Sequence, residues 1–414
     1  MGAIEGSTAP WRSLGWLAAL LASGCYFTNT GDDLRFDLPG RTDAGPGGAD
    51  AGPPPDPAPA VTQLDLLFVV DNSNDMVEEQ SSFLAELPYV FNILGSGDFD
   101  QDGTADFPAF TDVHVGVVTT DMGTGSYTVP TCALSDFGDD GVLQTVGNTS
   151  IGGCVATYPS FLDFVPGVRT SSDFAVDVAC VASVGSSGCG FEQPLEAGLK
   201  AVSPGGPTGW TAVGYEPPSF FQATPGRGDG SNAGFVRDGS VLAIVTLTTE
   251  EDCSIADPTV FDNTSRFGAT DLNLRCFAYA GDVLHNVERY VQGFLQLRRF
   301  PRHLVFAPIV GIPADLAPSA EGRTNYPVLV SDDLSIRDDR MEEQIDAAMP
   351  GRLVPSCNVP GRGLMFPPPR IVRVAQGLEA AGAQVTVQSI CQESYRDAMQ
   401  AIVARIRDAA AGDP

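Results

Sequence analysis

The sequence predicts an α/β fold, in which a doubly wound and mostly parallel sheet carries long disulfide-closed loop insertions. Three observations favour this class. Continuous apolar runs, such as residues 66–70, end abruptly in acidic or hydroxyl side chains. Stretches with apolar residues at helical spacing separate these runs, and eight of the nine cysteines lie in the connecting segments. Continuous apolar runs suit strands that are covered on both faces, and strands that alternate with helices form parallel sheets.

The elements follow from local patterns in chain order. After a first strand at 64–70, a helix is expected at 76–94, where Pro88 should kink or interrupt it and Gly95 should end it. The other expected elements are a strand at 113–119, an edge strand within the 132–189 excursion, a helix at 191–202, a strand at 241–248, a helix at 277–297, a strand at 303–312, a short helix near 341–349, a helix at 371–381, a strand at 384–390 and a closing helix at 395–406.

The N-terminal part of the chain is expected to be an export signal followed by a tether. Arg12 precedes an apolar core that is too short to span a bilayer, and the segment 1–25 ends in Ala-Ser-Gly-Cys25, which resembles a bacterial lipobox. That resemblance implies lipidation of Cys25; the alternative is a secretory peptide with an incidental cysteine. Residues 26–62, rich in Gly, Pro and Asp, are expected to form a disordered tether. One domain is expected at 63–410.

This domain is expected to carry insertions at about 122–189, 204–238, 254–275 and 313–369. An even number of cysteines in an exported chain predicts disulfide bonds, although many connectivities are possible. The spacing favours sequential pairing, in which each bridge closes one loop: Cys132–Cys154, Cys180–Cys189, Cys253–Cys276 and Cys357–Cys391. No C-x-x-C pattern and no Cys/His cluster indicates zinc.

Oxygen-bearing side chains follow two of the expected strands. Asp71, Ser73 and Asp75 come at alternate positions after the first apolar run, so that one tight loop can bring them together. The apolar run at 241–248 is likewise followed by Thr249 and the acids 250–252. Open α/β sheets bind ligands at the carboxyl ends of their strands, and Mg²⁺ and Ca²⁺ prefer oxygen ligands. Clustered carboxylates without a cation would repel each other, so a divalent ion is expected here; the alternative is a merely solvated acidic rim.

The Asp71-x-Ser73-x-Asp75 loop resembles the metal-ion-dependent adhesion site of von Willebrand factor A-type (vWA) domains, which begins Asp-x-Ser-x-Ser after a buried strand. The order of elements extends this resemblance over about 64–410, and lipoproteins of Gram-negative bacteria with cysteine pairs in their loops are the most similar class. The resemblance implies a vWA/Rossmann-like fold. It also implies a Mg²⁺ or Ca²⁺ site made by Asp71, Ser73, Asp75, Thr249, Glu250 and Asp252. The family's metal threonine would fall near Phe191 and Glu192.

A second acidic loop, GDFDQDGTADF, predicts a bound Ca²⁺ ion. Its ligands would be Asp98, Asp100, Asp102 and Asp106, because they stand at alternate positions around Gly103 as in a calcium-binding loop. The position of the usual bidentate glutamate holds Ala109 instead. The alternative interpretation is an acidic Asp-Gly turn between a helix and a strand.

Charge and motifs restrict the function. A net charge of −29 argues against nucleic-acid binding, because phosphates would be repelled. His114, His285 and His303 stand singly, and no G-x-S-x-G or H-E-x-x-H motif is present, so no enzyme is expected.

In vWA domains a partner's carboxylate completes the shell of the metal. We therefore expect an exported binding or adhesion protein of the cell envelope, an outer-membrane lipoprotein that touches the membrane through its N-terminal lipid only. It would recognise a protein or glycan partner. The alternatives are a metal-independent structural or assembly protein of the envelope and, last, an envelope hydrolase.

Overall fold

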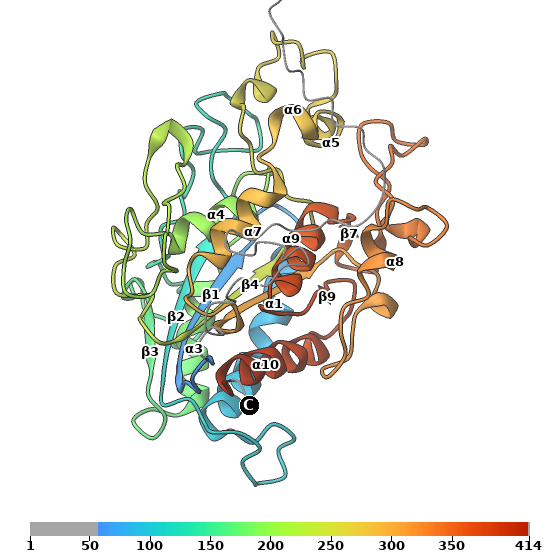
Figure 1. Ribbon diagram of the computed structural model, residues 1–414. Coiled ribbons are helices and arrows are strands. Elements are labelled where there is room, and N and C mark those ends of the chain that lie inside the picture. Colours follow the sequence, from blue (N-terminus) through green and yellow to red (C-terminus); the bar gives the residue numbers. More distant parts are fainter. Residues whose placement is uncertain (1–56, 413–414) are drawn as a thin grey trace, which may run out of the picture. The chain divides into compact units, whose positions relative to one another are not determined.

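A central sheet of seven strands organises the computed structural model, which describes residues 57–412 (Figure 1). The strands are β1 Gln63–Val70, β2 Asp112–Thr119, β3 Leu162–Phe164, β4 Val241–Leu247, β5 Leu304–Val310, β8 Gln384–Val385 and β9 Gln388–Ser389. Their order is β3-β2-β1-β4-β5-β8, and β9 also pairs with β5. Only β3 runs antiparallel to its neighbour. The predicted α/β class with a mostly parallel sheet is therefore confirmed.

The chain reverses its direction of travel across the sheet at β1. From β1 it proceeds to β2 and β3 on one side, and later to β4 and β5 on the other. Val70, the last residue of β1, is in register with Thr119 of β2 and Leu247 of β4. The residues that follow these three strands therefore gather at one edge of the sheet, where the crevice of an open α/β sheet lies.

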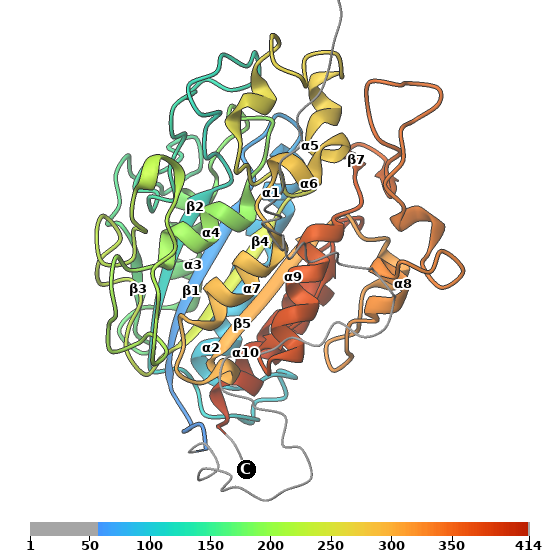
Figure 2. The same ribbon diagram turned by 45° about the horizontal axis from the view of Figure 1, so that its top comes forward.

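Helices cover both faces of the sheet (Figures 1 and 2). One face carries α1 Val77–Ala85, α2 Leu87–Ser96, α3 Ser171–Ala182 and α10 Arg396–Ala410. The other carries α4 Pro194–Val202, α7 Val287–Leu295 and α9 Pro369–Ala380. Side chains of a strand alternate between the two faces. Phe68 accordingly packs against Phe83 of α1, whereas Val69 lies against Gly198 of α4.

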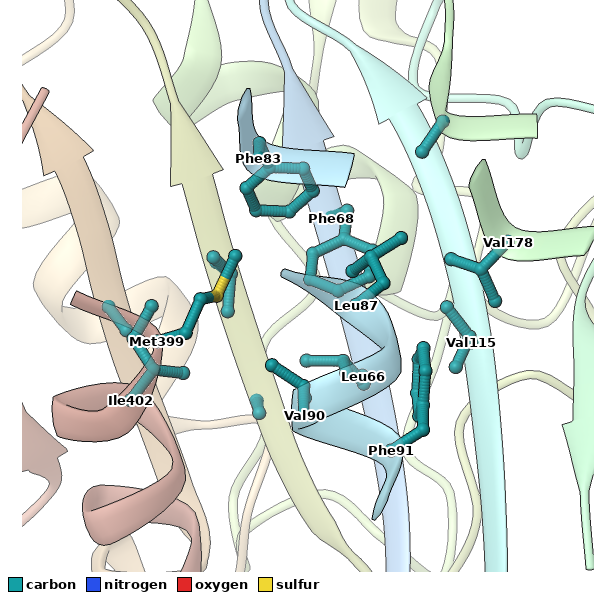
Figure 3. Packing of buried hydrophobic residues seen from close by; sticks show 14 of the residues in the cluster. Leu66, Phe68, Phe83, Leu87, Val90, Phe91, Val115, Val178, Met399 and Ile402 are labelled. Carbon is teal, nitrogen blue, oxygen red and sulfur yellow. The ribbon is translucent and has the colours of Figure 1, made fainter. Parts of the chain in front are cut away.

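Aliphatic and aromatic side chains together fill the first of these two layers (Figure 3). The rings of Phe68 and Phe83 meet edge to face with centroids 5.0 Å apart, and Phe91 meets Phe174 of α3 at 4.8 Å. All four rings are buried. Burying one such side chain contributes about 1.5–3 kcal/mol, so this layer holds α1, α2 and α3 on the sheet.

The helix expected at 76–94 is divided by Pro88, as predicted. The break falls at Glu86, between α1 and α2, and Pro88 occupies the first turn of α2, where its missing N–H costs nothing. The helix ends at Gly97 and not at Gly95. Gly97 has a φ of 75° and donates its N–H to the carbonyl of Ile93 at 2.8 Å. Glycine adopts this left-handed conformation without a steric penalty.

The prediction of a single helix at 277–297 is wrong. Three pieces replace it: α5 Arg275–Ala278, α6 Ala280–Val283 and α7. Leu284 leaves the helix to form an antiparallel bridge with Ile255, and the N–H of His285 donates to the carbonyl of Ser254 at 3.0 Å. A long-range pairing thus replaces helical hydrogen bonds that local periodicity favours.

Other differences lie in the insertions. Helix α3 was not expected, although Thr170 caps it through the N–H of Asp173. The short helix expected near 341–349 is absent from this described segment, and the strand expected at 384–390 is two short strands. The insertion at 313–369 holds α8 Tyr326–Val330 and a hairpin of β6 Cys357–Val359 and β7 Gly363–Met365. The 3₁₀ turns are Phe221–Ala223, Pro258–Phe261, Leu272–Leu274, Pro301–His303, Ala314–Leu316 and Asp339–Met341.

Four disulfide bonds close the loops: Cys132–Cys189, Cys154–Cys180, Cys253–Cys276 and Cys357–Cys391. The last two pairings are as predicted. The predicted pairings Cys132–Cys154 and Cys180–Cys189 are wrong, because Cys180 lies in α3 and the loop that carries Cys154 packs on that helix. The carbonyl of Cys180 accepts the N–H of Asn148 at 2.8 Å. Disulfides persist in oxidising environments, which indicates an exported protein.

The predicted export signal, Cys25 and the tether up to residue 56 lie outside the described residues. Within 57–412, no helix combines the length and the apolar character needed to cross a membrane.

Candidate metal centre

The loop after β1 is held in place by its own hydrogen bonds. Asp71 is fully buried; its Oδ1 accepts the N–H of Ser73 at 2.8 Å and its Oδ2 accepts the hydroxyl of Thr248 at 2.7 Å. The Ser73 hydroxyl donates to Asp75 Oδ1 at 3.1 Å. Gln80 of α1 donates to the Asp71 carbonyl at 2.8 Å. The three predicted oxygen side chains therefore lie together at the carboxyl end of β1.

The three acids that follow β4 are neighbours in sequence, but their carboxylates contact different parts of the structure. Glu250 lines a cavity at the sheet edge, and none of the described residues donates a hydrogen bond to its carboxylate. Glu251 accepts the N–H of Arg370, in the first turn of α9, at 2.7 Å. Asp252 accepts the N–H of Leu195, in the first turn of α4, at 3.1 Å. Of the three, only Glu250 accepts no hydrogen bond from a described residue.

Two residues predicted as metal ligands are therefore not brought into the cluster. The hydroxyl of Thr249 donates to the sulfur of Met76 at 3.7 Å. Asp252 Oδ2 accepts Nε and Nη2 of Arg370 at 3.2 and 3.1 Å. Carboxylates near a helix N-terminus are stabilised by the unpaired backbone N–H groups there. Asp252 thus has a structural role in joining α4 to α9.

Glu192 comes from a third loop, two residues before α4, near the position of the threonine that the vWA resemblance places there. Its side chain is only 4% exposed, lines the same cavity as Glu250, and accepts no hydrogen bond from any other residue in the described chain. Burying an unpaired carboxylate is costly. The vWA resemblance places Glu192 near the metal site. The family has a threonine there, so the sequence alone did not mark Glu192 as a metal ligand.

Asp71, Asp75, Glu192 and Glu250 act on one another electrostatically. Burial raises the pKa of Asp71 to about 6 and that of Glu250 to about 8, and the charge of Asp75 adds to both shifts. Burial, followed by the charges of Asp71 and Glu250, raises the pKa of Glu192 well above its usual range. No positively charged residue is among the causes of these three pKa shifts, so the acids repel one another without a compensating charge. We call these four acids and Ser73 the strand-end cluster.

The residues of the strand-end cluster fit a hard divalent cation. They supply carboxylate and hydroxyl oxygens from three loops, which is the donor type that Mg²⁺ and Ca²⁺ take. Glu192 and Glu250 accept no hydrogen bond from another described residue and line the adjacent cavity, so their oxygens are available to such an ion. The buried hydroxyl of Thr120, which follows β2, also has no hydrogen-bond partner among the described residues. The acids are widely spaced, since no three of them bring carboxylate oxygens within 4.8 Å of one another.

The second acidic loop is more tightly closed but exposed. Asp98, Asp100 and Asp106 bring carboxylate oxygens within 4.8 Å of one another, as the calcium-loop prediction requires. Asp102 does not join them; its Oδ1 accepts the N–H of Thr104 at 2.8 Å. The other carboxylates also accept backbone N–H groups, for example that of Gly103 to Asp98 Oδ2 at 2.8 Å. The loop therefore satisfies its own backbone, as an Asp-Gly turn does.

A cavity of about 360 Å³ opens beside the strand-end cluster. Glu192 and Glu250 form part of its wall, Phe191 and Phe277 contribute aromatic surface, and Glu343 from the insertion at 313–369 completes it. The sequence offered no signal for Glu343, because the segment that carries it has no regular secondary structure and is placed only by tertiary contacts.

No protein-family model matches this chain, and no curated protein matches it. The geometry of the strand-end cluster therefore carries the functional interpretation.

Proposed function

We propose that this protein is an envelope binding protein that recognises a protein or glycan partner through a divalent cation, Mg²⁺ or Ca²⁺, held by the strand-end cluster. One observation carries the proposal. Four acids from the loops after β1, before α4 and after β4 converge where the strand order reverses, and Glu192 is buried there without a donor from another residue. A buried group of this kind is stable when a cation neutralises it.

The arrangement supports a divergent vWA-type site. Asp71 and Ser73 keep the motif, Asp75 replaces its second serine, and Glu192 and Glu250 stand near the positions of the family's threonine and distal aspartate. A bound cation would supply an open coordination position for an oxygen of the partner. The chain's own residues orient the ligands: Thr248 and the N–H of Ser73 fix the carboxylate of Asp71, and Gln80 fixes the carbonyl of the same residue.

The cellular location extends this proposal. The lipobox-like sequence at Cys25 supports a lipid anchor, and the acidic, lysine-poor composition gives no support for nucleic acid as a partner. By the same resemblance, we propose an outer-membrane lipoprotein that touches the membrane through its N-terminal lipid.

Calorimetric titration with Mg²⁺, Ca²⁺ and Mn²⁺ tests the proposal. The sample is the full chain carrying Cys25→Ser, purified with its disulfides formed. One site per chain is expected, and Asp71→Ala or Glu250→Gln should remove it, because both changes delete a carboxylate from the cluster. Asp100→Asn, in the exposed acidic loop, is the matched control and should leave this site intact.

The outcomes separate the alternatives. Binding that only Asp100→Asn removes would assign calcium a structural role in the loop of residues 98–106 and sink the strand-end site. Absence of binding by every cation would favour the second candidate, a metal-independent structural or assembly protein on the same fold. Turnover of an envelope polymer by the purified chain would instead point to a hydrolase.

A further inference from the structure

The cavity beside the strand-end cluster has two kinds of wall. Phe191, Phe277 and Phe366 give it aromatic surface, and the Cys253–Cys276 disulfide adds a further apolar patch. The rest of the wall holds charged and polar side chains, acids and two arginines among them, with a few more apolar residues. Its volume of about 360 Å³ is at the small end of ligand cavities, which span about 300–1,000 Å³. The space therefore suits one long side chain better than an extended polymer.

The charges in the wall do not balance. Glu192, Glu250, Glu251 and Glu343 face the cavity together with the guanidinium groups of Arg352 and Arg370. The side chains of both arginines donate hydrogen bonds to aspartates outside this set of glutamates, although the charge of Arg370 also acts on Glu251 and Glu343. Arg352 donates Nε and Nη2 to Asp346 at 3.1 and 2.9 Å, and Arg370 donates the same two groups to Asp252 at 3.2 and 3.1 Å.

Acidic groups still outnumber basic ones in the wall when a divalent ion is bound. Such an ion would be neutralised by carboxylates of the strand-end cluster, Glu192 and Glu250 among them. Glu251 and Glu343 would remain, and their charges act on each other. Glu251 is held by backbone N–H groups of Asp252 and Arg370, both at 2.7 Å, whereas no described residue donates a hydrogen bond to Glu343. The charges of Arg370, Arg337 and Arg373 act on Glu343, but none of these side chains donates a hydrogen bond to it, so its oxygens can accept hydrogen bonds from a guest.

We infer that this cavity receives a basic side chain, arginine or lysine, from the polypeptide partner of the strand-end site. The stem of such a side chain suits the aromatic wall, its charged head suits Glu343 and Glu251, and cations also bind favourably over aromatic faces. The inference rests on the proposed function in one respect, since the partner that contacts the cation is taken to present this side chain. It narrows that partner to a protein with a basic residue beside its metal-binding group.

Two small probes that differ in charge but hardly in shape test the inference. N-acetyl-arginine amide carries the guanidinium, and N-acetyl-citrulline amide replaces it with a neutral urea. Their binding to the full chain carrying Cys25→Ser is measured by ligand-observed NMR titration in Mg²⁺ and again in EDTA. We expect the arginine probe to bind at least about tenfold more tightly, as hydrogen bonds between charged groups allow.

Variants identify the acid that is responsible. Glu343→Gln should lower the affinity for the arginine probe about tenfold and leave the citrulline probe unchanged. Glu342→Gln, one residue away and not in the wall of the cavity, is the matched control and should change neither affinity. Equal binding of the two probes, or an arginine affinity that is the same in Glu343→Gln, would overturn the inference.

The result is separable from that of the metal titration. Glu343→Gln should bind Mg²⁺ as the parent does, because Glu343 is not part of the strand-end cluster. Charge-selective probe binding in EDTA without any cation binding would overturn the proposed function and keep the cavity's preference. Cation binding without selectivity between the two probes would keep the proposed function and overturn the inference that the cavity receives a basic side chain.

Discussion

At the scale of single residues, adjacent acids have separate roles that their environment decides. Glu250, Glu251 and Asp252 follow one strand, yet Glu250 faces the strand-end cluster, Glu251 meets the first turn of α9 and Asp252 meets the first turn of α4. Glu192 joins Glu250 from a different loop. The value of each carboxylate to a cation therefore depends on whether a backbone N–H or an arginine already neutralises it.

Glu192→Gln tests this view through the pH dependence of stability. The folded pKa of Glu192 is raised, so the folded state holds a proton that the unfolded state has released. Stability is then greatest below the ordinary carboxyl pKa of about 4 and is lost as pH rises toward the raised folded pKa. In EDTA, the variant should be more stable than the parent at pH 8, because glutamine brings no ionising group into the buried site.

Urea unfolding at pH 5 and pH 8 measures this difference, with the exposed Glu288→Gln as a control that should match the parent. Saturating Mg²⁺ should stabilise the parent more than Glu192→Gln, because ligand binding to the folded state adds to stability. A variant with the parent's pH profile and the parent's Mg²⁺ affinity would contradict the role assigned to Glu192.

At the scale of elements, helix ends follow local chemistry where the backbone conformation demands one residue type. Pro88 starts α2, and Gly97 ends it with a φ of 75°. A Cβ atom at Gly97 would stand 2.1 Å from the carbonyl oxygen of Phe107, so that this turn accepts no larger residue without moving the chain. Where long-range pairing decides the end, as at Leu284, the helical pattern alone is misleading.

Gly97→Ala should lower the free energy of unfolding by more than the about 1–2 kcal/mol that a left-handed conformation alone costs an alanine. Gly103→Ala is the matched control: it also has a positive φ, of 92°, but no atom lies within 4 Å of its Cβ position. Thermal unfolding followed by circular dichroism compares the two. Equal losses of unfolding free energy in the two variants would contradict this prediction. They would show that a small backbone shift relieves the clash with the Phe107 carbonyl at no cost in stability.

At the scale of the whole molecule, buried charged groups link distant segments at the amino ends of the strands, opposite the strand-end cluster. Asp65 at the start of β1 is fully buried, accepts Nε of Arg237 at 2.8 Å and accepts Nη2 of Arg298 at 3.3 Å. Arg298, which follows α7, is 3% exposed, and Ser240 precedes β4 and also donates to Asp65. Segments far apart in sequence are thereby fixed at the amino ends of the strands, away from the strand-end cluster.

Asp65→Asn should destabilise the fold by about 3–5 kcal/mol, because removing one partner leaves buried guanidinium charges uncompensated. Asp163→Asn removes an acid whose side chain is 63% exposed and pairs with His114 at 3.2 Å. This control should cost no more than about 1 kcal/mol. Urea unfolding of both variants gives the comparison, and similar losses in the two would refute the importance of the buried network. Cation binding should survive in folded Asp65→Asn.

Much of the fold could be predicted from local patterns. The core strands β1, β2, β4 and β5 are apolar runs buried on both faces, and the break at Pro88 follows from its missing N–H. Helix α3 and the two disulfide bonds Cys132–Cys189 and Cys154–Cys180 could not be predicted from local patterns. Cysteine spacing records loop length, whereas the pairing of Cys154 with Cys180 depends on which loop packs against α3.

The sequence by itself determined the α/β class, the Asp71-Ser73-Asp75 loop and its place at the end of a buried strand. Strand periodicity and the abrupt change from apolar to acidic residues are local properties, so no tertiary information was needed for them. Only the tertiary structure decided which acids meet. It assigned Asp252 to Arg370 and α4, brought Glu192 to Glu250, and placed Glu343 in the same cavity. Neutralisation of a charge depends on neighbours in space, and those neighbours come from segments that are distant in the chain.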